Sequence, residues 1–328
     1  MNDGVPPDSG QEMARRLLGA TPVMTLSEAA EAAGVTHDRA LRYWRALGLT
    51  DPVGDERVFT DEDVRGFGVL AKLEADVDPE GEIGAALLRA LGHHMSRLAS
   101  WHVMAMEERA QRAAVSSADT SSDVVRTGVS YILDHVDDID DLVRYSWRRQ
   151  LTEIAAWRLG RDTENAQKLM LSVGFADMVS FTSLVRTLAP DELARLVTRF
   201  ELIAMDVVLR RRGRVIKLVG DAVLFVADTP LQGAAIACEL SAALSERNQL
   251  PAVRVGMATG EVVSRLGDIF GQPVNVASRL TEQAPPGAVL VDATTASAVE
   301  KEYETEPCEV RKIRGVGLVA PSILKGEA

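Results

Sequence analysis

The sequence predicts an α+β protein, with an all-α N-terminal half and a C-terminal domain built on a βαββαβ core. Apolar residues recur at helical spacing from Met24 to about Leu159. After Ala166 the period changes to short runs of Val, Leu, Ile and Phe, which are typical of strands. These runs alternate with helical segments in an order that favours an antiparallel sheet with helices on one face.

The N-terminal half begins with short helices and continues with long ones. "LSEAAEAAGV" predicts a helix with Ser27 as its cap and Gly34 as its stop. "THDRALRYWRALGL" follows and places three apolar residues on one helical face, Leu41, Trp44 and Leu47. Two short helices broken at Gly34 are a helix-turn-helix pattern. We expect Thr60 to cap a third helix, and helical sequence continues to about Leu159.

The C-terminal half reads as strands and helices in turn. "KLMLSVGF" predicts a strand, "APDELARLVTRFELIAMDVVLRRRG" a capped helix, and "RVIKLVGDAVLFV" a hairpin. A helix over 230–248, a strand over 252–259, a helix over 273–284 and a strand over 288–292 complete the core. We therefore assign a disordered lead to 1–20, an all-α domain to 21–150, a connector helix and linker to 151–165, and the βαββαβ domain to 166–328.

Composition narrows the class of protein. The 328 residues carry a net charge of −12, which disfavours non-specific nucleic-acid binding because the chain repels polyanions. Cys238 and Cys308 form no metal-ligand spacing and no disulfide framework, as in a reducing cytoplasm. The acidic, turn-rich N-terminus is not a signal peptide, and nowhere do 18 apolar residues run uninterrupted. We expect a cytoplasmic protein without a membrane span.

Two aspartates are candidates for chemistry. In "KLVGDAVLFV", Asp221 follows Gly220 between two apolar runs, so it is either an ordinary hairpin-turn residue or a placed carboxylate. Asp177 ends the strand in "VGFADMVSFT", just before a short apolar turn that enters a helix, where backbone N–H groups make an anion site. Two carboxylates at strand ends could share hard cations bound to a substrate's phosphates. No G-x-x-x-x-G-K-[ST] motif offers a P-loop instead.

A second group of polar residues occurs in "GDIFGQPVNVASRL". Asn275 and Arg279 are four residues apart and so share one helical face. Asp268 precedes Asn275 by seven residues, in the glycine-bounded loop before that helix. Arg279 could be no more than a solvated helix residue. However, a helix start rich in Asp, Asn and Arg beside glycines better suits a site that binds the phosphates and recognises the base of a nucleotide.

These motifs resemble those of the class III nucleotidyl cyclases, and specifically of the adenylyl cyclases. The resemblance covers about residues 166–326: "FADMVSFT" looks like the first metal motif, "KLVGDAVL" the second, and "GDIFGQPVNVASRL" the third. It implies conversion of ATP to 3′,5′-cyclic AMP and pyrophosphate. It also implies a homodimer with two composite sites, in which one subunit supplies the metal aspartates and its partner the other residues.

The same resemblance implies a role for each residue. Asp177 and Asp221 would hold two Mg²⁺ or Mn²⁺ ions, with the backbone carbonyl of Met178 as a further ligand. Lys217 and Asp268 would read the adenine edge, which disfavours guanylyl cyclase activity. In the helix that follows, Asn275 would position the ribose and Arg279 would stabilise charge on the α-phosphoryl group.

Two further positions bear on the match. Ser180 stands where the family usually has glycine in the phosphate loop, a departure that removes no known catalytic group. Arg314, in "KIRGVG", falls where the family often has a basic phosphate contact.

The N-terminal segment admits two interpretations. It is similar to the helix-turn-helix of bacterial transcription regulators, yet three arginines and three acidic residues in Met24–Leu49 cancel, where a DNA reader shows a positive stripe. It equally resembles the helical, autoinhibitory domain of acid-sensing class III adenylyl cyclases, some of which bind fatty acids, and we favour this interpretation. The alternative is a transcription regulator whose cyclase-like domain only senses nucleotide.

The effector at the N-terminal domain could be a proton or a fatty acid, and the histidines there fit the proton. All five histidines, the residues most able to titrate near neutral pH, precede residue 136. Surface histidines are common, however, and carboxylates can also sense acid. "GHHMSRLASWHVMAM" could line an apolar pocket or be plain core.

Overall fold

The computed structural model describes residues 14–77, 82–114, 121–159, 168–246, 250–265, 267–313 and 315–327. The chain divides into two compact units, Met1–Arg161 and Asp162–Ala328. Most of the lead over residues 1–20 lies outside the described residues, although residues 14–18 are helical. None of the helices in the described ranges combines the length and the apolar character needed to cross a bilayer.

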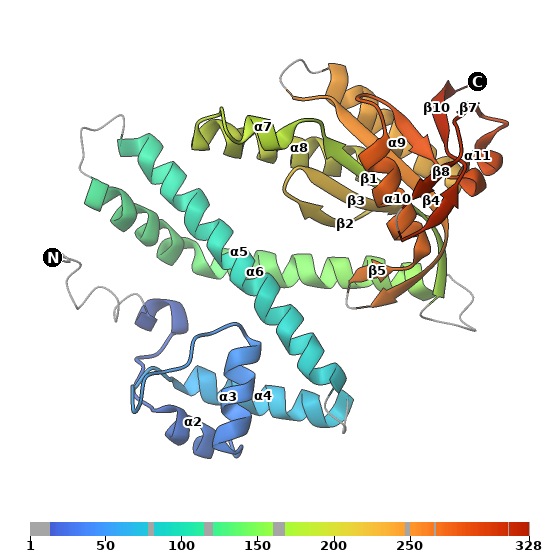
Figure 1. Cartoon of the computed structure of the whole chain (residues 1–328). Coiled ribbons are helices and arrows are strands. Elements are labelled where there is room, and N and C mark those ends of the chain that lie inside the picture. The colour runs from blue at the N-terminus through green and yellow to red at the C-terminus, as the bar shows by residue number, and fades with distance from the viewer. Residues whose placement is uncertain are drawn as a thin grey trace. The chain divides into compact units, whose positions relative to one another are not determined.

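The described part of the first unit is all-α apart from one isolated β-bridge, Met24 to Phe59. Its helices are α2 (Leu26–Ala32), α3 (His37–Ala46), α4 (Asp61–Val77), α5 (Glu82–Ala114) and α6 (Ser121–Leu159), as Figure 1 shows. The cap of α2 is Thr25 and not Ser27, because Thr25 and Glu28 form a capping box in which each side chain accepts from the other's backbone N–H. Thr60 caps α4 as expected, accepting from the Asp63 backbone N–H.

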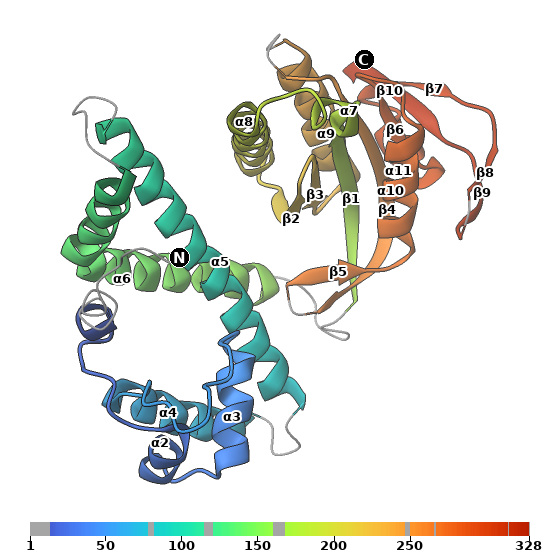
Figure 2. The same ribbon diagram turned by 60° about the vertical axis from the view of Figure 1, so that its left-hand side comes forward.

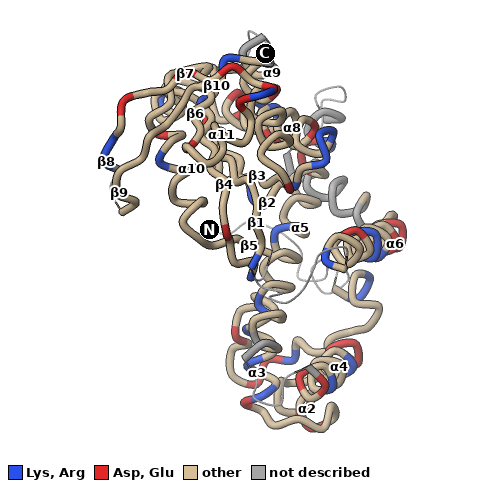
Figure 3. The backbone as a smooth tube through the Cα atoms, turned by 90° about the vertical axis from the view of Figure 1, so that its right-hand side faces the viewer, with Lys and Arg blue, Asp and Glu red and all other residues tan. Residues whose placement is uncertain are grey.

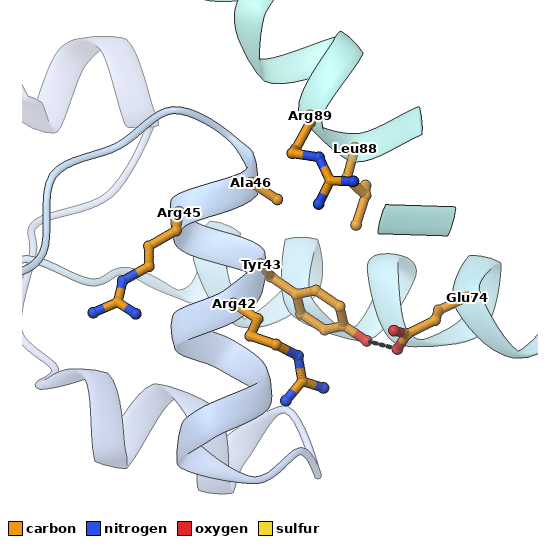
Figure 4. Close-up of a pocket in the computed structure, with 7 residues that line it drawn as sticks. All are labelled: Arg42, Tyr43, Arg45, Ala46, Glu74, Leu88 and Arg89. Carbon is orange, nitrogen blue, oxygen red and sulfur yellow. Dashed lines mark hydrogen bonds between the residues drawn. The ribbon is translucent and has the colours of Figure 1, made fainter. Parts of the chain in front are cut away.

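The core of this unit joins α2, α3 and α4. Phe59 and Phe67 are fully buried, and the Trp44 ring packs on Phe59 with 4.7 Å between centroids. At one end of α4, the Glu74 carboxylate accepts from the Tyr43 hydroxyl at 2.6 Å, drawn in Figure 4, and from Arg39 Nη2 at 2.6 Å. Burial and the Glu74 carboxylate raise the pKa of Tyr43 to about 12. These bonds fasten α3 to α4.

The second unit contains the expected βαββαβ order. β1 (Lys168–Met178) is followed by α7 (Phe181–Leu184), α8 (Pro190–Arg210), the hairpin β2 (Arg214–Val219) and β3 (Ala222–Ala227), α9 (Pro230–Glu246) and β4 (Val253–Arg265). Then come β5 (Asp268–Phe270), α10 (Gln272–Gln283), β6 (Val289–Val291), α11 (Ala293–Val299), β7 (Tyr303–Pro307), β8 (Arg311–Ile313), β9 (Gly317–Val319) and β10 (Ser322–Glu327). The predicted α+β class is confirmed.

The sheet differs from the expected one in two respects. Its order is β2-β3-β1-β4-β6-β10-β7, and β4 pairs with β6 in parallel, so the sheet is mixed and not antiparallel throughout. Helices also cover both faces. Val255 and Met257 of β4 pack with α8 and α9, whereas the alternating Gly256 faces α10, where an added Cβ would lie 2.3 Å from the Ala277 carbonyl oxygen. Figure 2 shows α8 and α10 on opposite sides of β1.

Candidate active site

Asp177 and Asp221 lie side by side at one edge of the second unit. Asp177 pairs in register with Ala222, the residue after Asp221, and the Met178 backbone N–H donates to the Asp221 carbonyl at 2.9 Å. Gly220, with φ of +60°, supplies the left-handed turn that places Asp221 at the hairpin tip. Burial raises the pKa of Asp221, and the neighbouring Asp177 carboxylate adds to the rise. The hairpin turn thus brings two carboxylates together, as the sequence predicted for these strand ends.

Arg254 completes this cluster, although it lies outside the motifs that the sequence singles out. It lies opposite Asp177 in the β1–β4 register, and its Nε and Nη2 donate to Asp177 Oδ2 at 2.8 and 2.6 Å. Its Nη1 donates to the Glu282 backbone carbonyl, at the end of α10, at 3.2 Å. An arginine inside the apolar strand "AVRVGMAT" was the available signal, because a charged residue on a half-buried strand usually has a partner.

Met178 is the third residue expected at the metal site. It ends β1 directly after Asp177, and its side chain is 1% exposed and belongs to the core beneath α8 and α9. Only its backbone can therefore serve a ligand on the Asp177 side of the sheet.

Lys217 and Asp268 meet although 51 residues separate them. Lys217 Nζ donates to Asp268 Oδ2 at 2.6 Å, while Asp268 Oδ1 accepts from the Ile269 backbone N–H at 2.9 Å. Asp268 was expected in a loop, but it begins β5, where it pairs with Arg265 of β4. Lys217 lies opposite Leu224 on β3 and so occupies the sheet face that also carries Asp177 and Arg254.

Asn275 and Arg279 lie on the exposed side of α10. The other side of this helix is buried against β1 and β4 through Pro273, Val276, Ala277, Leu280 and Thr281. Arg279 Nη1 donates to Glu282 Oε1 at 2.6 Å. No hydrogen bond or ion pair among the described residues joins Asn275 or Arg279 to Asp177, Asp221, Lys217 or Asp268.

The backbone conformation of Ser180 explains why the family usually has glycine at this position. Its φ of +62° and ψ of +20° lie in the left-handed region, which a glycine adopts without steric cost. The helix that it precedes, α7, is only four residues long, so the anion site expected there gains little from a helix dipole. Arg314 lies outside the described residues.

Comparison with known proteins places the chain in a family. Residues 164–326 match the adenylate and guanylate cyclase catalytic domain. A protein named adenylate cyclase from Glutamicibacter nicotianae is 34% identical over 332 residues, which cover 96% of this chain and 81% of that protein. A second protein named adenylate cyclase, from Streptomyces coelicolor, is 36% identical over 341 residues, which cover 94% of this chain and 87% of that protein. The chain therefore belongs to the class III adenylyl cyclase family.

A further relative bears on regulation. The pH-sensitive adenylate cyclase MT1302 of Mycobacterium tuberculosis is 38% identical over 153 residues, which cover 44% of this chain and 38% of that protein. This stretch is too short to include both units, so the match does not extend its pH sensitivity to this chain.

Proposed function

We propose that this adenylyl cyclase converts ATP to 3′,5′-cyclic AMP and pyrophosphate at sites built around Asp177 and Asp221. In this reaction the ribose 3′-hydroxyl gives its proton to water as its oxygen attacks the α-phosphorus. The bond from that phosphorus to the oxygen that bridges to the β-phosphorus breaks, and pyrophosphate leaves with the electron pair of that bond. The observation that carries the proposal is that Asp177, Arg254 and Lys217 share one sheet face, with Asp221 beside Asp177 and Asp268 bound to Lys217.

The carboxylate pair suits the divalent metal ions on which the family depends. Among the described residues no group of three or more His, Cys, Asp or Glu side chains gathers as a metal cage. Mg²⁺ seldom needs one, since it keeps its waters and is bound by one or two carboxylates together with substrate phosphates. Asp177, Asp221 and the Met178 carbonyl would hold two Mg²⁺ or Mn²⁺ ions, which would neutralise charge on the phosphates and activate the 3′-oxygen. Arg254 holds the Asp177 carboxylate in place through the two hydrogen bonds that it donates to Oδ2.

The remaining residues would read and orient the nucleotide. Lys217 would donate to adenine N1, and Asp268 would accept from the exocyclic amine. The bond of Asp268 to the Ile269 N–H keeps one carboxylate oxygen fixed for that task. Asn275 would hold the ribose, and Arg279 would stabilise the charge that develops on the α-phosphoryl group.

We infer that a working site needs two copies of the chain. Asn275 and Arg279 are exposed, and among the described residues no hydrogen bond or ion pair joins them to the metal aspartates of their own chain, as expected if they serve the partner's nucleotide. A head-to-tail homodimer would then contain two equivalent composite sites and bind two ATP molecules.

Complementation tests both the activity and the composite site. Purified wild-type chain should make cyclic AMP from ATP with Mg²⁺ or Mn²⁺. Asp177→Ala should be inactive, and Arg279→Ala should lose about 10²–10³ in rate, the usual scale for a lost charge donor. Co-expression should restore roughly a quarter of wild-type activity, because about half of random dimers are heterodimers and each has one intact site of two. Demonstrated heterodimers without recovery would show that each site lies within one chain.

We also propose that the N-terminal unit regulates the catalytic unit, with a proton or a fatty acid as effector. A groove of about 710 Å³ between the end of α3 and the middle of α5 could take an apolar chain. Its lining is mainly apolar and includes Leu49, Met95, Val103 and Met104. For the proton alternative, His93 and His94 are exposed on α5, with ring centroids 5.5 Å apart.

Truncation distinguishes this regulation from sensing within the catalytic unit. A chain beginning at Glu153 should show a different basal rate and a flatter pH profile between 5.5 and 8. Added oleate should change the rate of the full chain only. If the truncated chain keeps the full pH profile, the sensor lies in the catalytic unit.

The alternative, a DNA-binding regulator, is disfavoured by the arginines of the first unit. Arg39 is bound to Glu74, Arg45 to Asp51 and Arg57 to Glu28, so that acidic partners neutralise each of them. Figure 3 shows acidic and basic residues side by side on α2, α3 and α4. A duplex-binding assay at physiological salt should detect no binding.

A further inference from the structure

Two arginines meet at Glu282, in the last turn of α10. Its side chain accepts from Arg279 Nη1 at 2.6 Å, and its backbone carbonyl accepts from Arg254 Nη1 at 3.2 Å. The Arg279–Glu282 pair is solvent-accessible, with side chains 44% and 53% exposed. One residue thus contacts both the arginine of the metal cluster and the arginine expected to serve the partner's nucleotide.

The direction of the ion pair matters for catalysis. Asn275 lies one turn before Arg279 on α10, and Glu282 lies nearly one turn after it. Helical side chains lean toward the N-terminus, so an unpaired Arg279 would extend toward Asn275. The bond to Glu282 instead draws the guanidinium toward the C-terminal end and engages one of its donors with a carboxylate.

We propose that Glu282 is a positioning residue that holds Arg279 in a resting orientation until charge develops on the α-phosphoryl group in the transition state. The proposal rests on the function proposed above for Arg279. Because Arg279 must leave Glu282 before it can stabilise the transition state, the pair raises the barrier of the chemical step. Since the α-phosphoryl group is anionic, it then replaces Glu282 as the partner of Arg279 without leaving the charge of Arg279 unpaired.

The size of the effect follows from the exposure of the pair. Exposed ion pairs are weak, and in a helix a basic residue that precedes an acidic one is the less favourable order. The need to break the pair during each turnover should therefore slow the wild-type reaction by about two- to fivefold. Because the pair breaks between the bound state and the transition state, the change belongs to kcat and not to KM.

Kinetics of matched variants test the proposal. Glu282→Gln should raise kcat about two- to fivefold and leave KM for ATP unchanged, and the backbone bond to Arg254 should remain. Glu282→Asp keeps the charge and should behave like the wild type. The control is Glu306→Gln, which removes an exposed ion pair of the same 2.6 Å length, to Lys325, between β7 and β10. It should leave kcat unchanged, and all three variants should keep the wild-type unfolding temperature.

The double variant decides whether Glu282 acts through Arg279. In an Arg279→Ala background, Glu282→Gln should have no further effect. A decrease or no change in kcat on Glu282→Gln alone, or an increase that persists without Arg279, would overturn the proposal. A fully active Arg279→Ala chain would instead overturn the function of Arg279 and this proposal with it. Phenylglyoxal modification without nucleotide reports on the pair alone, and it should label Arg279 faster in Glu282→Gln.

Discussion

The packing of α10 on the sheet can be tested at Gly256, which lies against the backbone of that helix and is not one of the proposed site residues. A Cβ at this position would lie 2.2 Å from the Thr281 backbone nitrogen and 2.3 Å from the Ala277 carbonyl oxygen. Both atoms belong to the backbone of α10, so no rotamer change can relieve the clash. To restore a contact of about 3.5 Å, Gly256→Ala must move the helix away from β4 by roughly 1.3 Å.

This displacement should affect both stability and rate. Overpacking of this kind costs about 1–3 kcal/mol of unfolding free energy. A shift of about 1 Å in a group that positions the transition state can cost about 10² in rate. We therefore expect Gly256→Ala to fold with a lower unfolding temperature and to make cyclic AMP about 10² more slowly at saturating ATP. Circular dichroism during heating and initial rates at a temperature well below unfolding measure the two effects separately.

Two further variants make the test specific. Gly233→Ala presses on the same stretch of β4 from α9, on the other face, where its Cβ would meet the flexible Met257 sulfur at 2.8 Å. Its rate should stay close to that of the wild type. Thr281→Ala should not rescue Gly256→Ala, because the backbone atoms remain in place. If folded Gly256→Ala protein kept the wild-type rate, the position of α10 would not be what orients Arg279, and the reasoning would fail.

Three other changes have clear expected outcomes. Ser180→Gly should raise the unfolding free energy by about 1 kcal/mol with activity retained, since it removes a left-handed non-glycine residue; a loss of stability on heating would contradict this. Lys217→Glu combined with Asp268→Cys should reduce ATP turnover steeply, and wild-type turnover of GTP as fast as ATP would refute their base-reading role. Glu74→Ala should cost about 2 kcal/mol by leaving the Tyr43 hydroxyl without its acceptor. Hydrogen bonds from Tyr43 and Arg39 lower the pKa of Glu74 below 4.5, so this loss should be constant above pH 4.5 and shrink as the pH falls through the lowered value. A difference in unfolding temperature that grew toward low pH would contradict that sign.

The lowered pKa of Glu74 also bears on acid sensing. Its contribution to stability should change only below pH 4.5, so the bond between α3 and α4 should stay intact across the range from mildly acidic to neutral pH. If the N-terminal unit responds to protons in that range, the responding groups must lie elsewhere in it. The histidines of α5 are the natural candidates.

The sequence predicted the placement of those residues of the candidate site whose positions depend on short-range patterns. Asp177 and Asp221 each follow an apolar run that must form a strand, and a tight Gly-Asp turn brings the second strand back beside the first. The bond between Lys217 and Asp268 was not visible, because it depends on β5 pairing with β4 at the sheet edge. β5 has only three residues and begins with Asp, so it is too short to show an alternating pattern, which explains why Asp268 was expected in a loop.

Other misses have equally specific causes. Ser27 and Thr25 are both acceptable caps, but only Thr25 has a glutamate three residues later, and that spacing was the overlooked signal. The sequence prediction placed helices on only one face of the sheet. However, four consecutive residues of β1, Leu171 to Gly174, are buried, and such a run is typical of a strand that is covered on both sides.

The contacts of α10 join features that the sequence presents as separate motifs. Arg254 belongs to a strand, Arg279 to a helix and Asp177 to a strand end, yet the final turn of α10 contacts both arginines and Arg254 in turn holds Asp177. The carbonyls of that turn carry the partial negative charge of a helix C-terminus, which favours the approach of Arg254. Gly256 allows α10 to pack closely on β4. The distance between this helix and the strand therefore sets the positions of both Arg254, the partner of Asp177, and the backbone of Arg279. In a head-to-tail dimer these two groups would serve different nucleotides, so the seat of α10 would be shared by both composite sites.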